Sequence, residues 1–179
     1  MKEPVAAKLI CGVLAVPGES VEQAEREMVE AFGPIDARSE FVPFVDTDYY
    51  TREMGPELLR AWWSFRDLIR QDELARIKLR TNEIESRLAD SSGSRRVNLD
   101  PGYILTSRLV LATTKDYAHR IYLGDGIYAE VTLLHRDGQY HPLDWTYPDY
   151  RRPENISFFE KMRLTYKNQL RAGAGTDAR

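Results

Sequence analysis

The order of apolar and polar positions along the chain predicts a series of strands and helices. Residues 6–16, AAKLICGVLAV, are apolar on both alternating faces with Lys8 as the only charge, which is typical of a strand covered on two sides. The residues from Ser20 to Gln23 then have the pattern of a capping box, which indicates that a helix begins there. The apolar stripe of this helix comprises Val21, Ala24, Met28 and Phe32.

The same pattern predicts two further strands and a second helix. A strand is expected around residues 39–45, where Pro43 removes a hydrogen-bond donor and so indicates an edge or a bulge. Residues 58–66, LLRAWWSFR, separate into two faces with a period of two, which favours a half-buried strand over a helix. Asp72 is expected to cap a helix that runs to about Ala89. The buried stripe of that helix comprises Leu74, Ile77, Ile84 and Leu88.

A further strand in residues 95–100, RRVNLD, completes the order strand, helix, strand, strand, helix, strand. This order predicts an α+β protein with a ferredoxin-like βαββαβ sandwich, a fold that hosts many functions and therefore names none. We predict a single compact domain over residues 1–171. Residues 1–102 form its ferredoxin-like half, and residues 103–171 form a β-hairpin module with a terminal helix. Residues 172–179, AGAGTDAR, are expected to be a disordered tail.

The hairpin half begins with an ambiguous segment and ends with a helix. Residues 106–115 suit a helix or a strand equally. Turns are predicted at Gly124–Gly126 and at Arg136–Gln139, where GDG and RDGQ are hairpin signals. A last helix is expected from about Asn155 to Leu170. Its apolar stripe comprises Ile156, Phe159, Met162, Tyr166 and Leu170.

Two registers of the first hairpin make different predictions. A three-residue loop with a left-handed glycine separates the apolar from the polar residues, whereas a two-residue turn mixes them. The favoured register pairs Ile121 with Ala129, Leu123 with Ile127 and Arg120 with Glu130. The Arg120 and Glu130 pair has two interpretations, a surface ion pair of little energetic value or a desolvated pair in which Arg120 binds an anion.

The segment NLDPGYIL, residues 98–105, combines turn residues with polar side chains. In a strand that ends at Asp100, the side chains of Asn98 and Asp100 point to the same face. Pro101 and Gly102 fit the central positions of a type II turn. Two interpretations stay open: Asp100 accepts hydrogen bonds from the amides of its own turn, or the strand end presents an amide and a carboxylate to a site.

Composition narrows the classes of function. A formal net charge of −3 disfavours a nonspecific nucleic-acid binder. A single cysteine, Cys11, allows no intramolecular disulfide and no multi-cysteine zinc site, so we expect a reduced, cytoplasmic setting. No segment reaches the length of a membrane span, and no tight metal-binding spacing such as HExxH occurs. Lys78, Asn82 and Glu85 have helical spacing, and such charged faces are usually solvated.

Several motifs together resemble a known family. NLDPGYI, LATTKDYAHRIYL, GIYAEVTL and WTYPDY are similar to the bacterial and archaeal family called domain of unknown function 4416, and the resemblance covers most of the chain. Some members carry a GTP-binding label, but this sequence has no GxxxxGK[ST] loop and TTKD lacks the spacing of [NT]KxD. The family's motif segments contain Thr81, Asn82, Glu85, Asn98, Asp100, Tyr103, Lys115, His119, Arg120, Glu130 and Asp149.

These observations favour a domain that binds or acts on a phosphorylated or nucleotide-like small molecule, between the NLDPGY turn and the first hairpin. The candidate catalytic residues are Asp100, Glu130 and His119, although the sequence does not decide whether the protein is an enzyme. The candidate ligand-binding residues are Asn82, Asn98, Tyr103, Lys115, Arg120 and Asp149. A divalent metal or a nucleotide is the cofactor class that such groups could hold.

The alternatives are a noncatalytic interaction or assembly domain, including a homo-oligomer, and an RNA-associated module. The ligand hypothesis makes one spatial demand that separates it from them. It requires one cavity lined by Asn98, Asp100, Lys115, Arg120 and Glu130.

Overall fold

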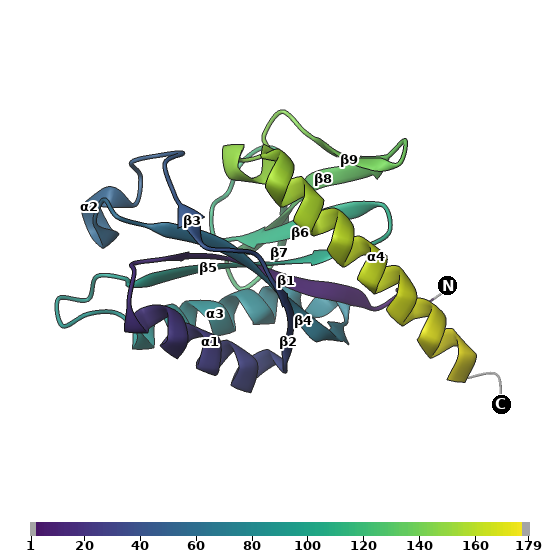
Figure 1. Ribbon diagram of the computed structural model, residues 1–179, viewed down its shortest axis with the longest axis horizontal. Helices are drawn as coiled ribbons and strands as arrows, with labels where there is room; N and C mark the ends of the chain where they lie inside the picture. Colours follow the sequence, from purple (N-terminus) through teal and green to yellow (C-terminus); the bar gives the residue numbers. More distant parts are fainter. Residues whose placement is uncertain (1–2, 177–179) are drawn as a thin grey trace.

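The computed structural model describes residues 3–176, which contain four α-helices, nine strands and two short 3-10 helices (Figure 1). The strands are β1 (Ala7–Ala15), β2 (Ile35–Arg38), β3 (Val42–Pro43), β4 (Leu59–Ile69), β5 (Val97–Ile104), β6 (Arg108–Thr113), β7 (Ile121–Gly124), β8 (Ile127–Arg136) and β9 (Gln139–Pro142). The helices are α1 (Glu19–Phe32), α2 (Thr51–Met54), η1 (Gln71–Glu73), α3 (Leu74–Arg87), η2 (Pro148–Arg151) and α4 (Pro153–Thr176).

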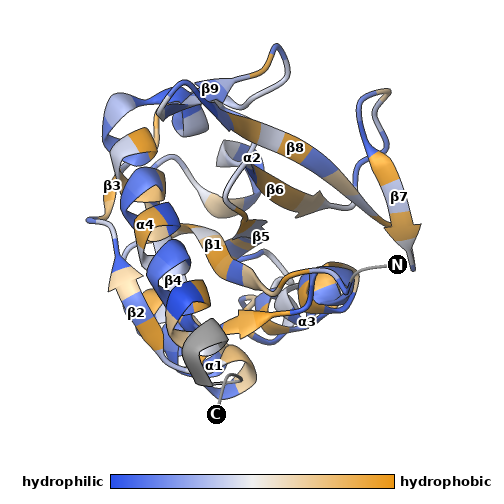
Figure 2. Cartoon of the chain, turned by 90° about the vertical axis from the view of Figure 1, so that its right-hand side faces the viewer, coloured by the Kyte–Doolittle hydropathy of each residue, from blue (hydrophilic) through white to orange (hydrophobic). Residues whose placement is uncertain are grey.

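All nine strands belong to one antiparallel sheet. Its order is β2-β4-β1-β5-β6-β8-β7, with β3 beside β4 and β9 beside β8. The sheet does not close, because β2 and β7 lie at its two ends (Figure 2). The α+β class is therefore confirmed, whereas the ferredoxin-like name stays an interpretation of the element order. The sheet contains strands from both predicted halves, and the boundary expected at residue 102 falls inside β5.

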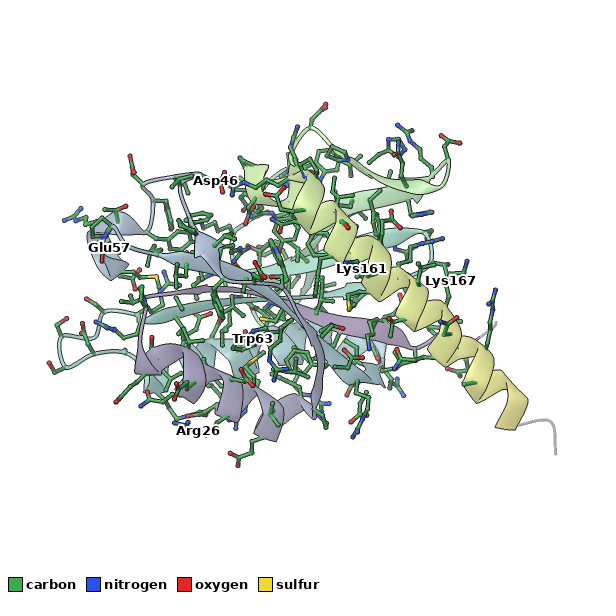
Figure 3. The ribbon with its side chains drawn as sticks, viewed as in Figure 1. Arg26, Asp46, Glu57, Trp63, Lys161 and Lys167 are labelled. Atoms are coloured by element: carbon green, nitrogen blue, oxygen red, sulfur yellow. The ribbon has the colours of Figure 1, made fainter. Side chains whose placement is uncertain are left out.

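The central strand β1 is covered on both faces, as its apolar pattern predicts. All nine of its residues are buried. Leu9, Cys11 and Val13 belong to the apolar core that α1 and α3 cover, and Trp63 of β4 lies in the same core (Figure 3). Ile10 belongs instead to the core under α4, with Phe159 and Tyr166. The fold is therefore three layers, with α1 and α3 on one face of the first strands and α4 on the other (Figure 1).

The two predicted helix caps are wrong. Ser20 makes no cap; its Oγ lies within the first turn of α1, is buried, and donates 2.9 Å back to the carbonyl of Val16. Asp72 does not begin the next helix either, because the chain enters α3 through η1, where the Arg70 amide donates to Glu73 Oε2. The carboxylate of Asp72 binds the exposed Arg70 guanidinium instead.

Other boundaries differ from those predicted. The strand expected at residues 39–45 is replaced by β2 and β3, which both pair with β4, and Pro43 sits on the short outer strand β3. The ambiguous segment 106–115 contains strand β6. The last helix continues to Thr176, so residues 172–176 of the expected disordered tail are helical, while residues 177–179 lie outside the described residues. Within residues 3–176 no helix is both long and apolar enough to cross a membrane.

The turn predicted at Pro101 and Gly102 does not exist. Strand β5 runs through both residues, and Gly102 does not adopt a positive φ. A Cβ atom on Gly102 would lie 2.4 Å from the carbonyl oxygen of Val110 on β6. Glycine is needed here because the two backbones approach each other closely, and not because the chain turns.

Strands β5 and β6 separate next to this close approach, on the N-terminal side of Gly102 and the C-terminal side of Leu111. Residues 102–104 of β5 pair with β6, but residues 97–101 pair only with β1. The following residues of β6, Ala112 and Thr113, pair only with β8. Alternate residues of a strand direct their backbone groups to the same side. Pro101 therefore faces the same side as Leu99, where β6 is no longer paired with β5, and proline has no N–H that would need a partner there. The sheet therefore has a split between β5 and β6.

The first hairpin has only part of the predicted register, and its predicted three-residue loop is wrong. Ile121 pairs with Ala129, which confirms that part of the prediction, but the turn has two residues, Asp125 and Gly126, with φ of 52° and 76°. A bulge between Tyr122 and Gly124 shifts the pairing, so Gly124 pairs with Ile127 and the predicted pairing of Leu123 with Ile127 is wrong. The apolar face of the hairpin is open at β7, where Ile121 is 72% exposed.

Replacing Gly102 with alanine tests the close approach. Gly102→Ala would force the Val110 carbonyl away and is expected to lower the free energy of unfolding by about 1–3 kcal/mol. Urea denaturation measures this loss. Gly173→Ala in the exposed part of α4, where an added Cβ meets nothing, is the matched control and should not destabilise. Equal stability of the two variants would contradict the packing described for β5 and β6.

Candidate functional site

A cavity of about 630 Å³ opens where β5 and β6 separate. Its walls come from strands β1, β4, β5, β6 and β8, from α3, and from the segments around residues 44–50, 114–120 and 147–150. The predicted site residues that line it are Asn82, Asn98, Asp100, Lys115, Arg120, Glu130 and Asp149. The spatial demand of the ligand hypothesis is therefore met.

Two predicted site residues do not line the cavity. Tyr103 alternates with Asp100 along β5, so its side chain points to the opposite face, where it is buried in the apolar core. His119 lies behind the cavity wall and contacts Glu130. Four further residues that line the cavity are absent from the predicted site, namely Arg60, Arg95, Tyr49 and Tyr50.

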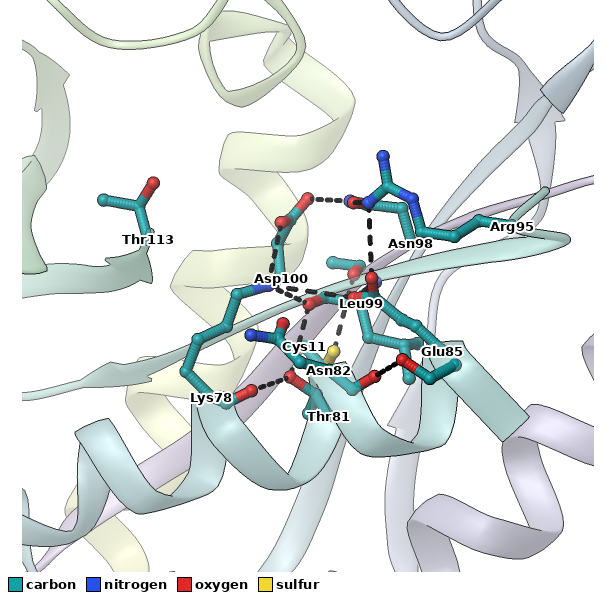
Figure 4. A network of polar contacts seen from close by, with 12 residues as sticks. Cys11, Lys78, Thr81, Asn82, Glu85, Arg95, Asn98, Leu99, Asp100 and Thr113 are labelled. Atoms are coloured by element: carbon teal, nitrogen blue, oxygen red, sulfur yellow. Dashed lines mark hydrogen bonds and ion pairs between the residues drawn. The ribbon is translucent and has the colours of Figure 1, made fainter. Parts of the chain in front are cut away.

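Side chains of α3 occupy the place of the missing neighbour of β5. The Leu99 N–H donates 2.7 Å to Glu85 Oε1, and the Leu99 carbonyl accepts a 2.7 Å hydrogen bond from Lys78 Nζ (Figure 4). Backbone groups buried in a protein must find partners, and here two side chains supply what β6 does not. Lys78 and Glu85 are only 5% and 4% exposed, so the interpretation of this helix face as solvated is wrong for both.

A continuous chain of hydrogen bonds runs from Glu85 to Asp100. Arg95 Nη1 lies 3.3 Å from Glu85 Oε2 and donates 2.8 Å to Asn98 Oδ1 (Figure 4). The Asn98 Nδ2 amide donates 2.8 Å to Asp100 Oδ2. Asn98 and Asp100 do share a face, as predicted, and the carboxylate of Asp100 is held by side chains and not by the amides of a turn. Arg95 is itself fixed by two 2.7 Å contacts with Glu53 of α2.

Arg60 of β4 is a buried cation at the base of the cavity. Its Nη1 lies 3.4 Å from Asp100 Oδ2, and its Nε lies 2.9 Å from Asp149 Oδ2 as an ion pair without hydrogen-bond geometry. The guanidinium stacks over Trp62 at 4.3 Å from the ring centre. Gly12 makes room for this stack, since a Cβ there would lie 2.7 Å from the Trp62 ring.

The carboxyl groups of this wall differ in acidity. Burial raises the pKa of Glu85 and of Asp149, despite the cations beside them. Burial acts in the same direction on Asp100, but the Lys78 and Arg60 cations outweigh it and lower the pKa of that carboxyl. Asp100 is also the most accessible of the three, with 27% of its side chain exposed against 6% for Glu85 and 8% for Asp149. Asp100 is therefore an ionised acceptor that a ligand can reach.

The opposite wall is built around Arg120. Arg120 Nε donates 2.7 Å to Glu130 Oε2, and the two side chains are 2% and 1% exposed, so the surface interpretation of this pair is wrong. Arg120 also donates 2.9 Å to the Lys115 carbonyl and 2.9 Å to the Tyr147 hydroxyl. One arginine thereby fixes the loop after β6 and a tyrosine at the rim of the cavity.

Glu130 holds Arg120 in place on this wall. Its Oε2 contacts His119 Nε2 at 3.1 Å as well as Arg120, and its Oε1 accepts a 3.3 Å hydrogen bond from Thr132. His119 stacks on Trp145 with ring centres 4.8 Å apart. Both carboxylate oxygens of Glu130 thus have protein partners, which suits a residue that positions Arg120.

The donor set of the cavity favours hydrogen bonding over metal binding. No group of three or more His, Cys, Asp or Glu side chains suited to a metal occurs within residues 3–176. The carboxylates that line the cavity instead face arginine and lysine side chains. Such a lining can recognise a polar small molecule through directed hydrogen bonds.

The comparison with protein families identifies the chain. A family model described as "Domain of unknown function (DUF4416)" matches residues 5–166, and the protein belongs to this family. The match extends across both walls of the cavity. No curated protein and no solved structure matches the chain significantly.

Removing the Lys78 ammonium tests whether α3 supports the free edge of β5. Lys78→Met leaves the Leu99 carbonyl with only the long 3.5 Å hydrogen bond from the Thr81 hydroxyl and leaves Glu85 without the Lys78 ammonium, so the free energy of unfolding should fall by about 3 kcal/mol or more. Arg80→Met on the exposed side of α3 breaks only a surface pair with Glu83 and should cost less than about 1 kcal/mol. Chemical denaturation distinguishes these values, and similar small losses in both variants would contradict the proposed support.

Proposed function

We propose that this protein binds a phosphorylated or nucleotide-like small molecule in the cavity between β5 and β6. The observation that carries the proposal is the convergence of Asn98 and Asp100 of β5 with Lys115 and Arg120 of the loop after β6 around one space. A volume of about 630 Å³ is within the roughly 300–1,000 Å³ common for small-molecule sites.

The lining combines two kinds of contact that such a ligand needs. Tyr49, Tyr50 and Tyr147 supply aromatic surface at the rim and walls, which suits a base or a sugar ring. Asp100 and Asn98 supply a fixed acceptor and an oriented amide. The site is also largely preformed, because Asn98 on one wall and Arg120 on the other are already held by protein partners and lose little freedom on binding.

One observation favours the alternative role in assembly. Strand β7 is an outer strand of the sheet, and its residues Ile121, Tyr122 and Leu123 are 72%, 60% and 43% exposed. An apolar edge strand without charges can pair with another chain. For an RNA-associated role, the net charge of −3 and the internal pairing of the cavity arginines give no comparable support.

Blocking the cavity tests the proposed function. Nucleoside monophosphates and sugar phosphates are first screened by thermal shift, because a ligand that binds the folded state raises the melting temperature. Thr114 is exposed on the cavity rim, so Thr114→Trp should fill the entrance and abolish the shift while the melting temperature of the free protein changes little. Thr106→Trp, on an exposed turn away from the cavity, is the matched control and should bind like the wild type.

Two outcomes would contradict the proposal. One is the absence of a shift with any compound of either class. The other is a ligand-dependent shift that Thr114→Trp leaves intact, since binding would then occur elsewhere, for example at β7.

A further inference from the structure

The charged side chains that line the cavity differ in whether the protein itself neutralises them. Most of its cations form ion pairs with carboxylates of the protein itself. The pairs are Arg60 with Asp149, Lys78 with Glu85 and Asp100, Arg95 with Glu53 and Glu85, and Arg120 with Glu130. A phosphate that approached any of these groups would meet a carboxylate at the same place. The arginine-rich depth of the cavity is therefore a poor phosphate site.

Lys115 differs from the other lining cations. Within the described range 3–176 its ammonium has no carboxylate partner, and it lies 4.0 Å from the ring centre of Tyr49. The residue is exposed and lines the cavity, so its charge stands at the rim. Its backbone carbonyl is held by Arg120, which fixes the loop that carries it.

The unused groups inside the cavity have the opposite preference. Asp100 Oδ2 is engaged by Asn98 and Arg60, whereas Oδ1 lies 3.7 Å from Lys78 Nζ, beyond hydrogen-bonding distance. Oδ1 can therefore accept a hydrogen bond from a ligand. Asn82 lines the same cavity from α3, and its side-chain amide has no partner among the described residues (Figure 4). The Asp100 carboxylate suits hydroxyl or amino donors and opposes an anion, and the Asn82 amide can accept from or donate to a hydroxyl.

We infer that the ligand is a phosphorylated polyhydroxy compound, such as a sugar phosphate or the ribose phosphate of a nucleotide, bound with its hydroxyls inward on Asp100 and Asn82 and its phosphate outward on Lys115. This inference rests on the proposed function and deepens it. The opposite orientation would place the phosphate against the Asp100 carboxylate and leave Lys115 without a role. The cavity thus selects its ligand by hydroxyls at one end and by charge at the other.

Two matched sets of probes test the orientation by calorimetry. One set is ribose 5-phosphate, 2-deoxyribose 5-phosphate and ribose, and the other is AMP, 2′-deoxy-AMP and adenosine. The wild type should favour the phosphorylated over the unphosphorylated probe and the hydroxylated over the deoxy probe. Lys115→Gln should weaken the phosphorylated probes about 5-fold and leave ribose or adenosine unchanged.

Asp100→Asn should change the preference for hydroxylated over deoxy probes. It is expected to bring the ratio between hydroxylated and deoxy probes close to one, a loss of about tenfold, while the preference for phosphate persists. Asn82→Ala removes a partly exposed amide that has no partner within residues 3–176, so it should weaken the hydroxylated probes at the same end with little change in stability. Lys161→Gln on the outer side of α4 is the control for Lys115→Gln and should change nothing (Figure 3).

The outcomes separate this inference from the proposed function. Tighter binding of phosphorylated probes by Asp100→Asn, with no effect of Lys115→Gln, would place the phosphate inward and overturn the inference while the cavity remains the binding site. Unchanged preferences in all the cavity variants would overturn it in the same way. Failure of the wild type to bind any probe of either set would overturn the inference and the proposed function together.

Discussion

The free edge of β5 at Leu99 is the constraint on which the rest of the site depends. Its backbone N–H and carbonyl face a gap where β6 has separated, and Glu85 and Lys78 bind them at 2.7 Å each. Unpaired backbone groups would make the gap too costly to keep. Because α3 supplies the partners, the sheet can stay open at this point, and the opening is the cavity.

Lys78 and Glu85, which bind the free edge of β5, also contact the polar side chains that line the cavity. Lys78 lies 3.7 Å from Asp100 Oδ1, and Glu85 contacts Arg95, which orients Asn98. A buried network of this kind is stable only when all of its members have partners. Among residues 3–176, the Oδ1 atom of Asp100, the Asn82 amide and the Lys115 ammonium have unused hydrogen-bonding capacity, and they mark where a ligand can add contacts without breaking the network.

The sequence predicts what depends on local pattern. The strands around Cys11 and Trp63 follow from apolar periodicity, and the Arg120 and Glu130 pair follows from separating polar from apolar residues across a hairpin. The prediction of a turn at Pro101 and Gly102 was wrong because the same dipeptide also suits a strand. Glycine allows that strand to approach β6 closely, and proline is tolerated where β6 is no longer paired. Only long-range strand pairing decides between the two structures.

The burial of Lys78 and Glu85 was missed for the same reason, because it depends on a gap between strands distant from α3 in the sequence. Arg60 could have been noticed, since it alternates with Trp62 on one face of a predicted strand, and an arginine beside a tryptophan on a covered face needs buried carboxylates. Which carboxylates those are, Asp100 and Asp149, depends again on long-range contacts.

The most direct test of the central claim is a map of backbone amide chemical shifts by ¹H–¹⁵N NMR during titration with ribose 5-phosphate or AMP. If the split between β5 and β6 is the ligand site, the amides that shift most will be those of Leu99, Asp100 and residues 113–115. Shifts confined to β7, or distributed without reference to the split, would contradict the claim that the separation of these strands forms the site.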